Sequence, residues 1–552
     1  MNRALYIFSF LFLTAFLVFP VGYIFTQSFF LNARPSLAVY AALCSNDLVR
    51  ESLLNSFLLG AVVTVLTAVI GIPLAFLFVR YAFPGKNLFR VLLFLPLIVS
   101  PFVAAIGMRQ MLSRFGSLNL VLLKLHLIKE PVSFLGSGFL GIVILQTLHL
   151  FPIMVLNVSA SLNSFDTSCE EASYNCGANF WTTFFRVTLP LLLPGLYAAA
   201  SVVFVWSLTD LGTPLVFEYT KLAPVQIFRS LNDLNVNPAG YALVVTVLSL
   251  TLALFAVTKR YVEKRPYVTQ KTQATFVEKQ LPAGARLPVL AGLFLFSTLC
   301  LAPHASIILT SFSERWFFTV LPDRYTTAFY QTVFHHRLTT SGFVNSILYS
   351  SGSTVVDLFL GFSIGYILAR TRFRGRFILD LLSMAPLAIP GIVIAVGYLS
   401  SFANTPLDPR VNPVPLLILS YSVRRLPYLV RSTYASFQQL SEHLEEASYN
   451  LGASPRYTFR RVVLPLVSPG LFAGGILVFA FAVLEVASSL ILASRERFYP
   501  LAKVIYAMAG RLTDGPQVAS AMGVFGMVLI GLAFLAASKL AARRIGEFFR
   551  IG

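Results

Sequence analysis

The sequence predicts an all-α membrane protein of about 12 transmembrane helices, arranged as two parallel six-helix repeats. Three observations lead to this fold class. First, 57% of the residues are hydrophobic, only 12% are charged, and the mean hydropathy is +0.76, which does not suit a water-soluble globule. Second, long apolar runs recur along the whole chain. Third, the segment that begins at Glu171 recurs 275 residues later at Glu446.

Each apolar run is long enough to cross a membrane, because a span needs about 20 mostly apolar residues. The runs lie near residues 5–29, 53–79, 88–112, 138–162, 189–217, 239–258, 287–311, 342–369, 378–403, 413–437, 464–493 and 516–538. The first run follows Arg3 at once and exceeds the usual core of a signal peptide. We therefore expect it to be an uncleaved anchor, the alternative being a cleaved signal.

The basic residues predict the orientation, because loops rich in Lys and Arg stay in the cytoplasm. The clusters are Arg80, Lys86 and Arg90; Lys259, Arg260, Lys264 and Arg265; Arg370, Arg372, Arg374 and Arg376; Arg456, Arg460 and Arg461; and Lys539, Arg543 and Arg544. With a cytoplasmic N-terminus, all of them and the C-terminus fall inside. Topogenesis and anionic lipid headgroups account for the net charge of +19, so we expect no nucleic-acid partner.

The repeat divides the chain into two units, residues 1–258 and 287–552, joined by a charged linker at 259–286. Early markers such as Asn55-Ser56 and Arg80 recur 290 residues later, at Asn345-Ser346 and Arg370, whereas later markers recur after 275. The first unit therefore holds 15 extra residues, which we place within 113–137, an outside loop. Two units with an even number of spans run parallel, and a pore between them is expected.

Two polar loops, at 163–188 and 438–463, preserve the repeat most closely. Both read Glu-Ala-Ser-Tyr-Asn-x-Gly and then continue through Arg-Val-x-Leu-Pro-Leu-x-x-Pro-Gly-Leu. This pattern resembles the EAA loop of permease subunits of binding-protein-dependent ABC importers, which implies the type I importer permease fold. In that family a helical hairpin in the loop docks in a groove of an ATP-binding subunit. The alternative is that gene duplication left two hydrophilic connectors without a function.

The resemblance carries the coupling role over to six residues: Glu171, Ala172, Gly177, Glu446, Ala447 and Gly452. The alternative for the two glutamates is that they only cap or solubilise a helix. Ser173 and Ser448 stand where the family has a second Ala, which we interpret as a tolerated small replacement.

The chain is not expected to be an enzyme, because it contains no Gly-x4-Gly-Lys-Ser/Thr phosphate loop. The resemblance instead implies two copies of a cytoplasmic ABC ATPase, an extracytoplasmic substrate-binding protein and lipid as partners, in a bacterial inner membrane. We expect no cofactor and no bound metal. The four cysteines, at 44, 169, 176 and 300, form no CxxC pair.

Ionisable residues inside spans are candidates for the transport pathway, because they are costly in a bilayer. Asp210 and Glu485 are related by the 275-residue offset, and paired acids in a pore would favour a cation. Alternatively, each acid caps a helix break or pairs with a neighbouring span. Arg424 and Arg425 could face an anionic ligand, counter Glu485 or extend to an interface. Asp357 has no partner by symmetry, and we interpret it as a packing or hydrogen-bonding residue.

Among these importers, a fused chain of this length resembles the ferric-iron, thiamine and aminophosphonate permeases. The segments 369–376, 386–393 and 208–214 resemble the iron permeases most, so ferric iron is the expected substrate. Thiamine is the main alternative, followed by aminophosphonates or polyamines. A gradient-driven secondary transporter is an alternative of a different class, but it would not need two EAA loops.

Overall fold

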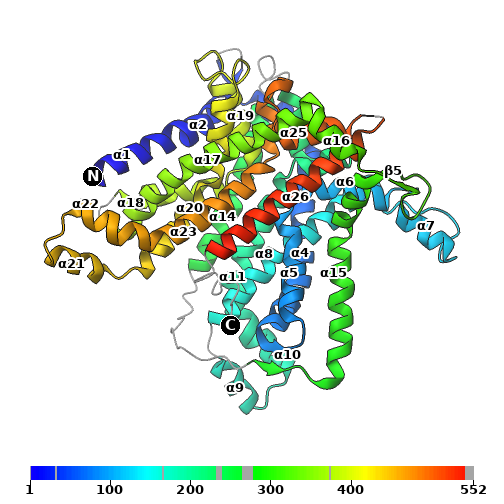
Figure 1. Ribbon diagram of the computed structural model, residues 1–552, viewed down its shortest axis with the longest axis horizontal. Coiled ribbons are helices and arrows are strands. Elements are labelled where there is room, and N and C mark those ends of the chain that lie inside the picture. The colour runs from blue at the N-terminus through cyan, green and yellow to red at the C-terminus, as the bar shows by residue number, and fades with distance from the viewer. Residues whose placement is uncertain are drawn as a thin grey trace. The chain divides into compact units, whose positions relative to one another are not determined.

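The computed structural model describes residues 2–31, 34–164, 167–231, 239–263, 278–371, 375–511 and 513–540, and these are almost entirely helical (Figure 1). In the first half the α-helices are α1 (Asn2–Leu13), α2 (Phe19–Ser28), α3 (Ala38–Ser45), α4 (Asp47–Arg80), α5 (Lys86–Ile98), α6 (Pro101–Leu112), α7 (Ser117–Lys124), α8 (Phe139–Ser164), α9 (Ser168–Asn175), α10 (Phe180–Thr183), α11 (Leu189–Thr209), α12 (Gly212–Val216), α13 (Ala223–Ser230) and α14 (Ala239–Glu263).

In the second half they are α15 (Ala283–Phe312), α16 (Ala328–His335), α17 (Arg337–Arg370), α18 (Arg376–Met384), α19 (Gly391–Ser401), α20 (Val414–Gln439), α21 (Glu442–Asn450), α22 (Pro455–Thr458), α23 (Leu464–Val483), α24 (Ala487–Leu492), α25 (Leu501–Ala509) and α26 (Gly515–Leu540). The π-helical turns are η1 (Thr14–Val18), η2 (Phe184–Thr188) and η5 (Phe459–Val463), and the 3₁₀ turns are η4 (Ala385–Leu387) and η6 (Glu496–Phe498). Both η2 and η5 lie between a hairpin and the long helix after it, so the two halves share this irregularity.

Short strands occur only as three pairs within the described ranges. The pairs are β1 (Phe30–Leu31) with β2 (Arg34–Pro35), antiparallel; β3 (Tyr81–Ala82) with β4 (Lys279–Gln280), parallel; and β5 (Ser313–Arg315) with β6 (Arg324–Tyr325), antiparallel. Lys279–Gln280 belongs to the predicted linker, of which residues 264–277 lie outside the described part of the chain.

The predicted spans coincide with these helices. In the described ranges, nine helices are long and apolar enough to cross a membrane, or eleven if each of two bent helix pairs counts as one span. The bent pairs, α5–α6 and α18–α19, turn by 97° and 104° near prolines and cover the third predicted span of each half. The remaining predicted span coincides with α20, which carries three arginines and is therefore less apolar. The all-α membrane fold is confirmed.

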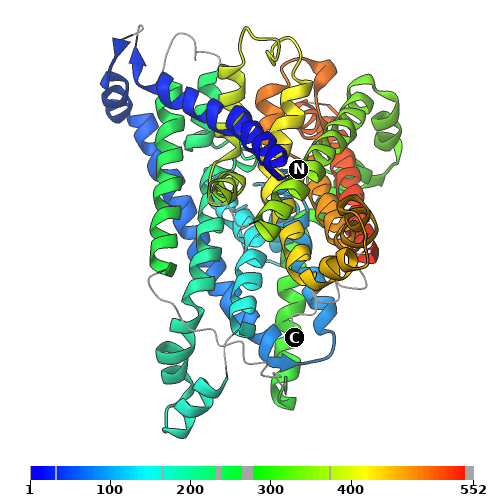
Figure 2. The same ribbon diagram turned by 90° about the vertical axis from the view of Figure 1, so that its left-hand side faces the viewer.

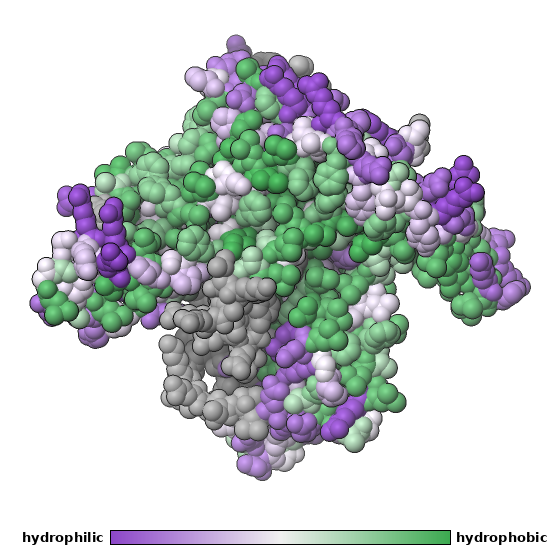
Figure 3. Space-filling view, viewed as in Figure 1, coloured by the Kyte–Doolittle hydropathy of each residue, from purple (hydrophilic) through white to green (hydrophobic). Residues whose placement is uncertain are grey.

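Hydrophobic residues cover the sides of the helices, as expected for segments solvated by lipid. Figure 3 shows this for one face, where hydrophilic residues gather at helix ends and loops. Exposed apolar side chains on membrane-spanning helices include Phe294 and Leu295 of α15 and Val355 of α17.

The chain folds into two compact units that differ from the two sequence halves. One unit takes Met1–Asn46, Ile227–Leu248 and Thr326–Gly546, and the other takes Asp47–Gln226 and Ser249–Tyr325. The first helix of each sequence half, α1 or α15, therefore packs in the unit that consists mainly of the other half. Leu13 of α1 is buried against Leu360 and Ile364 of α17, whereas α15 buries Leu293 and Cys300 in the core formed by α4, α5 and α8.

The Asn-Ser pair near the start of α4 and the repeated pair near the start of α17 make equivalent hydrogen bonds in the two halves. In both halves the Ser hydroxyl accepts a backbone N–H from the first turn of a short helix, and the Asn amide donates to a carbonyl just before it. These bonds join Ala223 N to Ser56 Oγ (2.8 Å), Leu501 N to Ser346 Oγ (2.6 Å), Asn55 Nδ2 to Lys221 O (3.2 Å) and Asn345 Nδ2 to Tyr499 O (3.1 Å). The long helix therefore caps α13 in one half and α25 in the other.

We expect Ser56→Ala and Ser346→Ala each to lower the free energy of unfolding by about 1 kcal/mol, because each removes a cap from a buried helix start. The measurement is the thermal unfolding midpoint of the purified protein in detergent. Ser45→Ala is the control, since the exposed Ser45 hydroxyl only bonds the carbonyl of Ala42 in its own helix. An unchanged midpoint in both cap variants would contradict this capping role.

Candidate functional site

Each predicted coupling loop forms a helical hairpin, α9–α10 in one half and α21–α22 in the other. In both copies the chain leaves the first helix through a left-handed glycine, with φ of 82° at Gly177 and 81° at Gly452. The N–H of the next residue, Ala178 or Ala453, donates to a carbonyl five residues earlier at 3.1 Å in both copies. A Cβ on either glycine would meet no atom within 4 Å, so backbone conformation, not space, requires glycine here.

A hydroxyl pair joins the two helices of each hairpin. Ser173 Oγ lies 2.9 Å from Thr183 Oγ1, and Ser448 Oγ lies 2.8 Å from Thr458 Oγ1. From the sequence, both serines were predicted only as small replacements for Ala, and this contact was not predicted. The repeat did contain a sign of this contact, because Thr183 is repeated as Thr458 at the same 275-residue offset as the serines.

The predicted coupling residues lie on the exposed surface of the hairpins. Glu171 and Ala172 are exposed, and so are Glu446 and Ala447. The Glu446 carboxylate lies 3.1 Å from His443 Nδ1 on the same helix. Large apolar side chains are exposed beside these residues: Tyr174, Phe180, Trp181 and Phe185 in one hairpin, and Leu444, Tyr449, Leu451 and Tyr457 in the other. Apolar and charged groups that are exposed together suit a protein-binding surface.

The glutamate that precedes each exposed one turns inward. Glu170 Oε2 lies 2.9 Å from Arg80 Nη2, at the end of α4, and Glu445 Oε1 lies 3.0 Å from Arg370 Nε, at the end of α17. Partial desolvation of the half-exposed Tyr174 ring, followed by the Glu170 carboxylate, raises the pKa of Tyr174. Figure 1 shows both hairpins at the tips of the helices to which they connect, and Figure 2 shows the α9–α10 hairpin at the lower end of the view. The repeat relates the two arginines to each other, but the pairing of each with a glutamate was not predicted from the sequence.

Asp210 follows α11 at a break before α12. Its Oδ1 accepts the backbone N–H of Gly212 at 3.1 Å, and its Oδ2 accepts a bond from Gln146 Nε2 of α8 at 3.1 Å. Ser207 in turn donates to the Gln146 side chain. Asp210 thus caps the broken helix and ties it to α8, the arrangement that sequence analysis gave as one alternative.

Glu485 lies at the corresponding break between α23 and α24, and only 2% of its side chain is exposed. It pairs with Arg424 and with Arg425, whose Nη2 lies 2.7 Å from Glu485 Oε2. Arg425 also stacks over Phe481, with its Cζ atom 5.4 Å from the ring centroid. Asp357, fully buried on α17, accepts a bond from Ser422 at 2.6 Å, in line with its interpretation as a hydrogen-bonding residue. Both arginines therefore counter Glu485.

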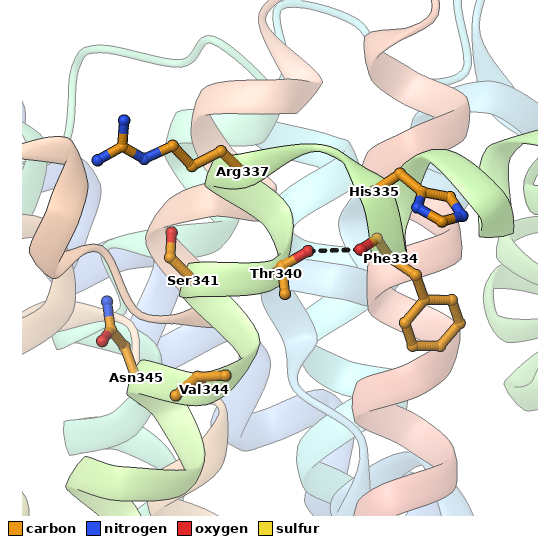
Figure 4. A pocket seen from close by; sticks show the side chains of 7 residues that line it. All are labelled: Phe334, His335, Arg337, Thr340, Ser341, Val344 and Asn345. Atoms are coloured by element: carbon orange, nitrogen blue, oxygen red, sulfur yellow. Dashed lines mark hydrogen bonds between the residues drawn. The ribbon is translucent and has the colours of Figure 1, made fainter.

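A pocket of about 470 Å³ lies at the end of α17 opposite to Arg370. Figure 4 shows Arg337, Ser341 and Asn345 on one side of it and His335 and Phe334 on the other. Across the described ranges, no three His, Cys, Asp or Glu side chains gather closely enough to hold a metal ion. The pocket is therefore a surface pocket near a helix end, lined by both polar and apolar side chains.

A second groove, of about 530 Å³, is apolar and runs between membrane-spanning helices α17, α23 and α26. Val355, Leu358, Phe479 and Leu532 are among the residues that line it. Its position on lipid-facing helices indicates a surface that hydrocarbon chains cover.

Several known proteins are similar to this chain. It is 28% identical over 490 residues to FbpB 1 of Haemophilus influenzae, covering 87% of this chain and 76% of that protein. It is 27% identical over 505 residues to the ferric transport system permease protein FbpB of Actinobacillus pleuropneumoniae, covering 91% and 72%. The molybdate/tungstate transport system permease protein WtpB of Pyrococcus abyssi is 30% identical over 166 residues, covering 30% of this chain and 64% of that protein.

A solved bacterial ABC transporter involved in the import of the acidic polysaccharide alginate gives a TM-score of 0.41 at 16% identity, covering 48% of this chain and 95% of that chain. A family model matches residues 67–265 and 361–547, which is more than half of the chain and includes both hairpins. The chain belongs to the family of inner membrane components of binding-protein-dependent transport systems, as an ABC importer permease.

Proposed function

We propose that this permease carries ferric iron across the bacterial inner membrane, receives it from an extracytoplasmic binding protein, and is driven by ATP hydrolysis in two partner subunits. The assignment of ferric iron as the substrate rests on the similarity, over 91% of the chain, to a protein named as a ferric transport system permease. The matched portion of the molybdate/tungstate relative covers only 30% of the chain.

The two hairpins are the proposed docking sites for the ATPase subunits, one subunit for each hairpin. Three features support this role: the hairpins are built alike, their exposed surfaces are partly apolar, and each presents an unburied Glu-Ala pair. The proposed coupling residues are Glu171, Ala172, Gly177, Glu446, Ala447 and Gly452. In this proposal the carboxylates meet basic or hydrogen-bonding groups of the ATPase, and the alanines allow close backbone approach.

The hairpins and both termini are proposed to face the cytoplasm, in keeping with the basic residues around them. ATP is then hydrolysed on the side where the hairpins lie, and the binding protein docks on the opposite side.

The four candidate pathway residues receive a structural role in this proposal. Asp210 caps a helix break, and Glu485 neutralises Arg424 and Arg425 at the matching break. These four side chains are already bonded to other protein groups. In this proposal they therefore maintain the shape of the pathway, and the two carboxylates do not serve as free iron ligands.

Uptake by cells tests the substrate. Cells that make this chain with its ATPase and binding protein should take up radiolabelled ferric iron, and an ATPase-inactivating mutation should reduce that uptake to the level of cells without the chain. Labelled thiamine and labelled molybdate are tested in the same way as alternative substrates. ATP-dependent uptake of either alternative substrate without iron uptake would overturn the iron assignment while leaving the permease role intact.

A further inference from the structure

An ion pair joins each hairpin to the end of a long helix, Arg80–Glu170 in one half and Arg370–Glu445 in the other, and alignment of the two halves does not explain this repetition. Arg80 recurs at Arg370 after 290 residues, whereas Glu170 recurs at Glu445 after 275. The two offsets differ because an insertion lies between the paired residues in the first half. Both halves nevertheless bring the arginine and the glutamate to a similar separation, 2.9 Å and 3.0 Å. The contact itself is therefore common to both halves.

Burial separates the two glutamates of each hairpin. The paired side chains are mostly covered, with 12% of Arg80, 15% of Glu170, 10% of Arg370 and 17% of Glu445 exposed, whereas 64% of the Glu446 side chain is exposed. Adjacent residues on a helix point about 100° apart. One carboxylate can therefore face the membrane domain while its neighbour faces outward.

Further bonds hold the paired side chains in place. Glu170 Oε1 accepts a bond from the Thr188 hydroxyl, at the end of η2, at 2.7 Å. Arg370 Nη2 donates to the Leu440 carbonyl at 2.7 Å, and Arg370 Nη1 lies 3.3 Å from Glu442 Oε1. Each hairpin is thus fastened to the end of a long helix, α4 or α17, that packs within the core of its unit.

We infer that Arg80–Glu170 and Arg370–Glu445 are positioning pairs that transmit hairpin movement to α4 and α17. This inference rests on the proposed coupling role of the hairpins. An ion pair of a planar guanidinium with a carboxylate resists displacement, so a hairpin moved by its ATPase pulls the end of the long helix with it. The exposed glutamates meet the ATPase, and the inward-facing glutamates connect that contact to the membrane helices.

Uncoupling is the result that separates this role from simple docking. In proteoliposomes containing the complete transporter, Glu170→Gln with Glu445→Gln should lower iron uptake by about 5- to 150-fold, the range of ordinary coupling free energies, while ATP hydrolysis stays within about twofold. The charge-swapped variant, Arg80→Glu and Glu170→Arg with Arg370→Glu and Glu445→Arg, should recover part of the uptake. Uptake is normalised to the amount of inserted protein.

Glu130→Gln with Glu314→Gln is the matched control, because it makes the same carboxylate-to-amide change at two exposed glutamates that lie outside the hairpins. It should transport normally. Unchanged uptake in the glutamine variant, or hydrolysis that falls in proportion to uptake, would overturn the positioning role. If the glutamine variant does not insert, the charge-swapped variant decides the question. No detectable transport by an inserted charge-swapped variant would overturn the inference, whereas recovered transport would support it.

The outcome is distinguishable from failure of the coupling proposal itself. If Glu171 and Glu446 are essential but Glu170→Gln with Glu445→Gln transports normally, only the positioning role fails. If replacing Glu171 and Glu446 leaves transport normal, the hairpins do not couple and both proposals fail.

Discussion

Glu171→Arg combined with Glu446→Arg is expected to reduce ATP-dependent uptake to background while the protein still inserts in the membrane. The two carboxylates are exposed on the hairpins, so their replacement costs little folding free energy. At a docking surface, however, reversal of a charge places like charges against the partner, which costs several kcal/mol and removes productive binding. The measurement is labelled iron uptake, with the inserted protein quantified in the same membranes.

Glu130→Arg with Glu314→Arg is the control for surface charge reversal, because both glutamates are exposed and lie outside the hairpins. This variant should keep its uptake. Normal uptake by the hairpin variant would contradict the coupling role and would favour the interpretation of both glutamates as solubilising groups.

Glu485→Ala is expected to have the largest effect on stability. It leaves Arg424 and Arg425 without their carboxylate, and removal of one partner from a buried ionic cluster typically costs about 3–5 kcal/mol. The cost should fall toward the lower end of that range, since 26% of the Arg424 side chain is exposed and water screens it in part. The measurement is the thermal unfolding midpoint in detergent, together with the yield of folded protein.

Replacement of the whole cluster separates charge imbalance from loss of packing. Glu485→Met, Arg424→Met and Arg425→Met together should recover most of the stability, because no buried charge is then left unpaired. Asp210→Asn is the matched substitution at the corresponding break, and it should cost only about 1 kcal/mol because Asp210 makes hydrogen bonds and no ion pair among the described residues. A midpoint unaffected by Glu485→Ala would contradict the neutralising role.

The sequence was sufficient to predict the membrane helices and both hairpins. Apolar runs revealed the spans because a bilayer demands them of each span separately. The 275-residue repeat marked the two loops, and the resemblance to the importer family implied their hairpin shape. In the structure, Gly177 and Gly452 form the turns in the left-handed conformation, which is a local requirement. These features depend on short stretches of chain, so a single sequence contains enough information to find them.

Features that depend on tertiary packing were not predicted. The exchange of α1 and α15 between units leaves no local signal, because an apolar helix packs equally well on either half. The Arg80–Glu170 contact spans 90 positions and two different repeat offsets, so alignment marked the arginine without its partner. For Arg424 and Arg425, the sequence left three environments open, and the structure places both against the Glu485 carboxylate.

The decisive measurement is the amount of ferric iron taken up per ATP hydrolysed by proteoliposomes that contain this chain, its ATPase and its binding protein, with ATP supplied on one side of the membrane. We expect iron uptake that depends on ATP hydrolysis and disappears in Glu171→Arg with Glu446→Arg. Uptake that proceeds without ATP and follows an imposed ion gradient would contradict it and identify a gradient-driven transporter.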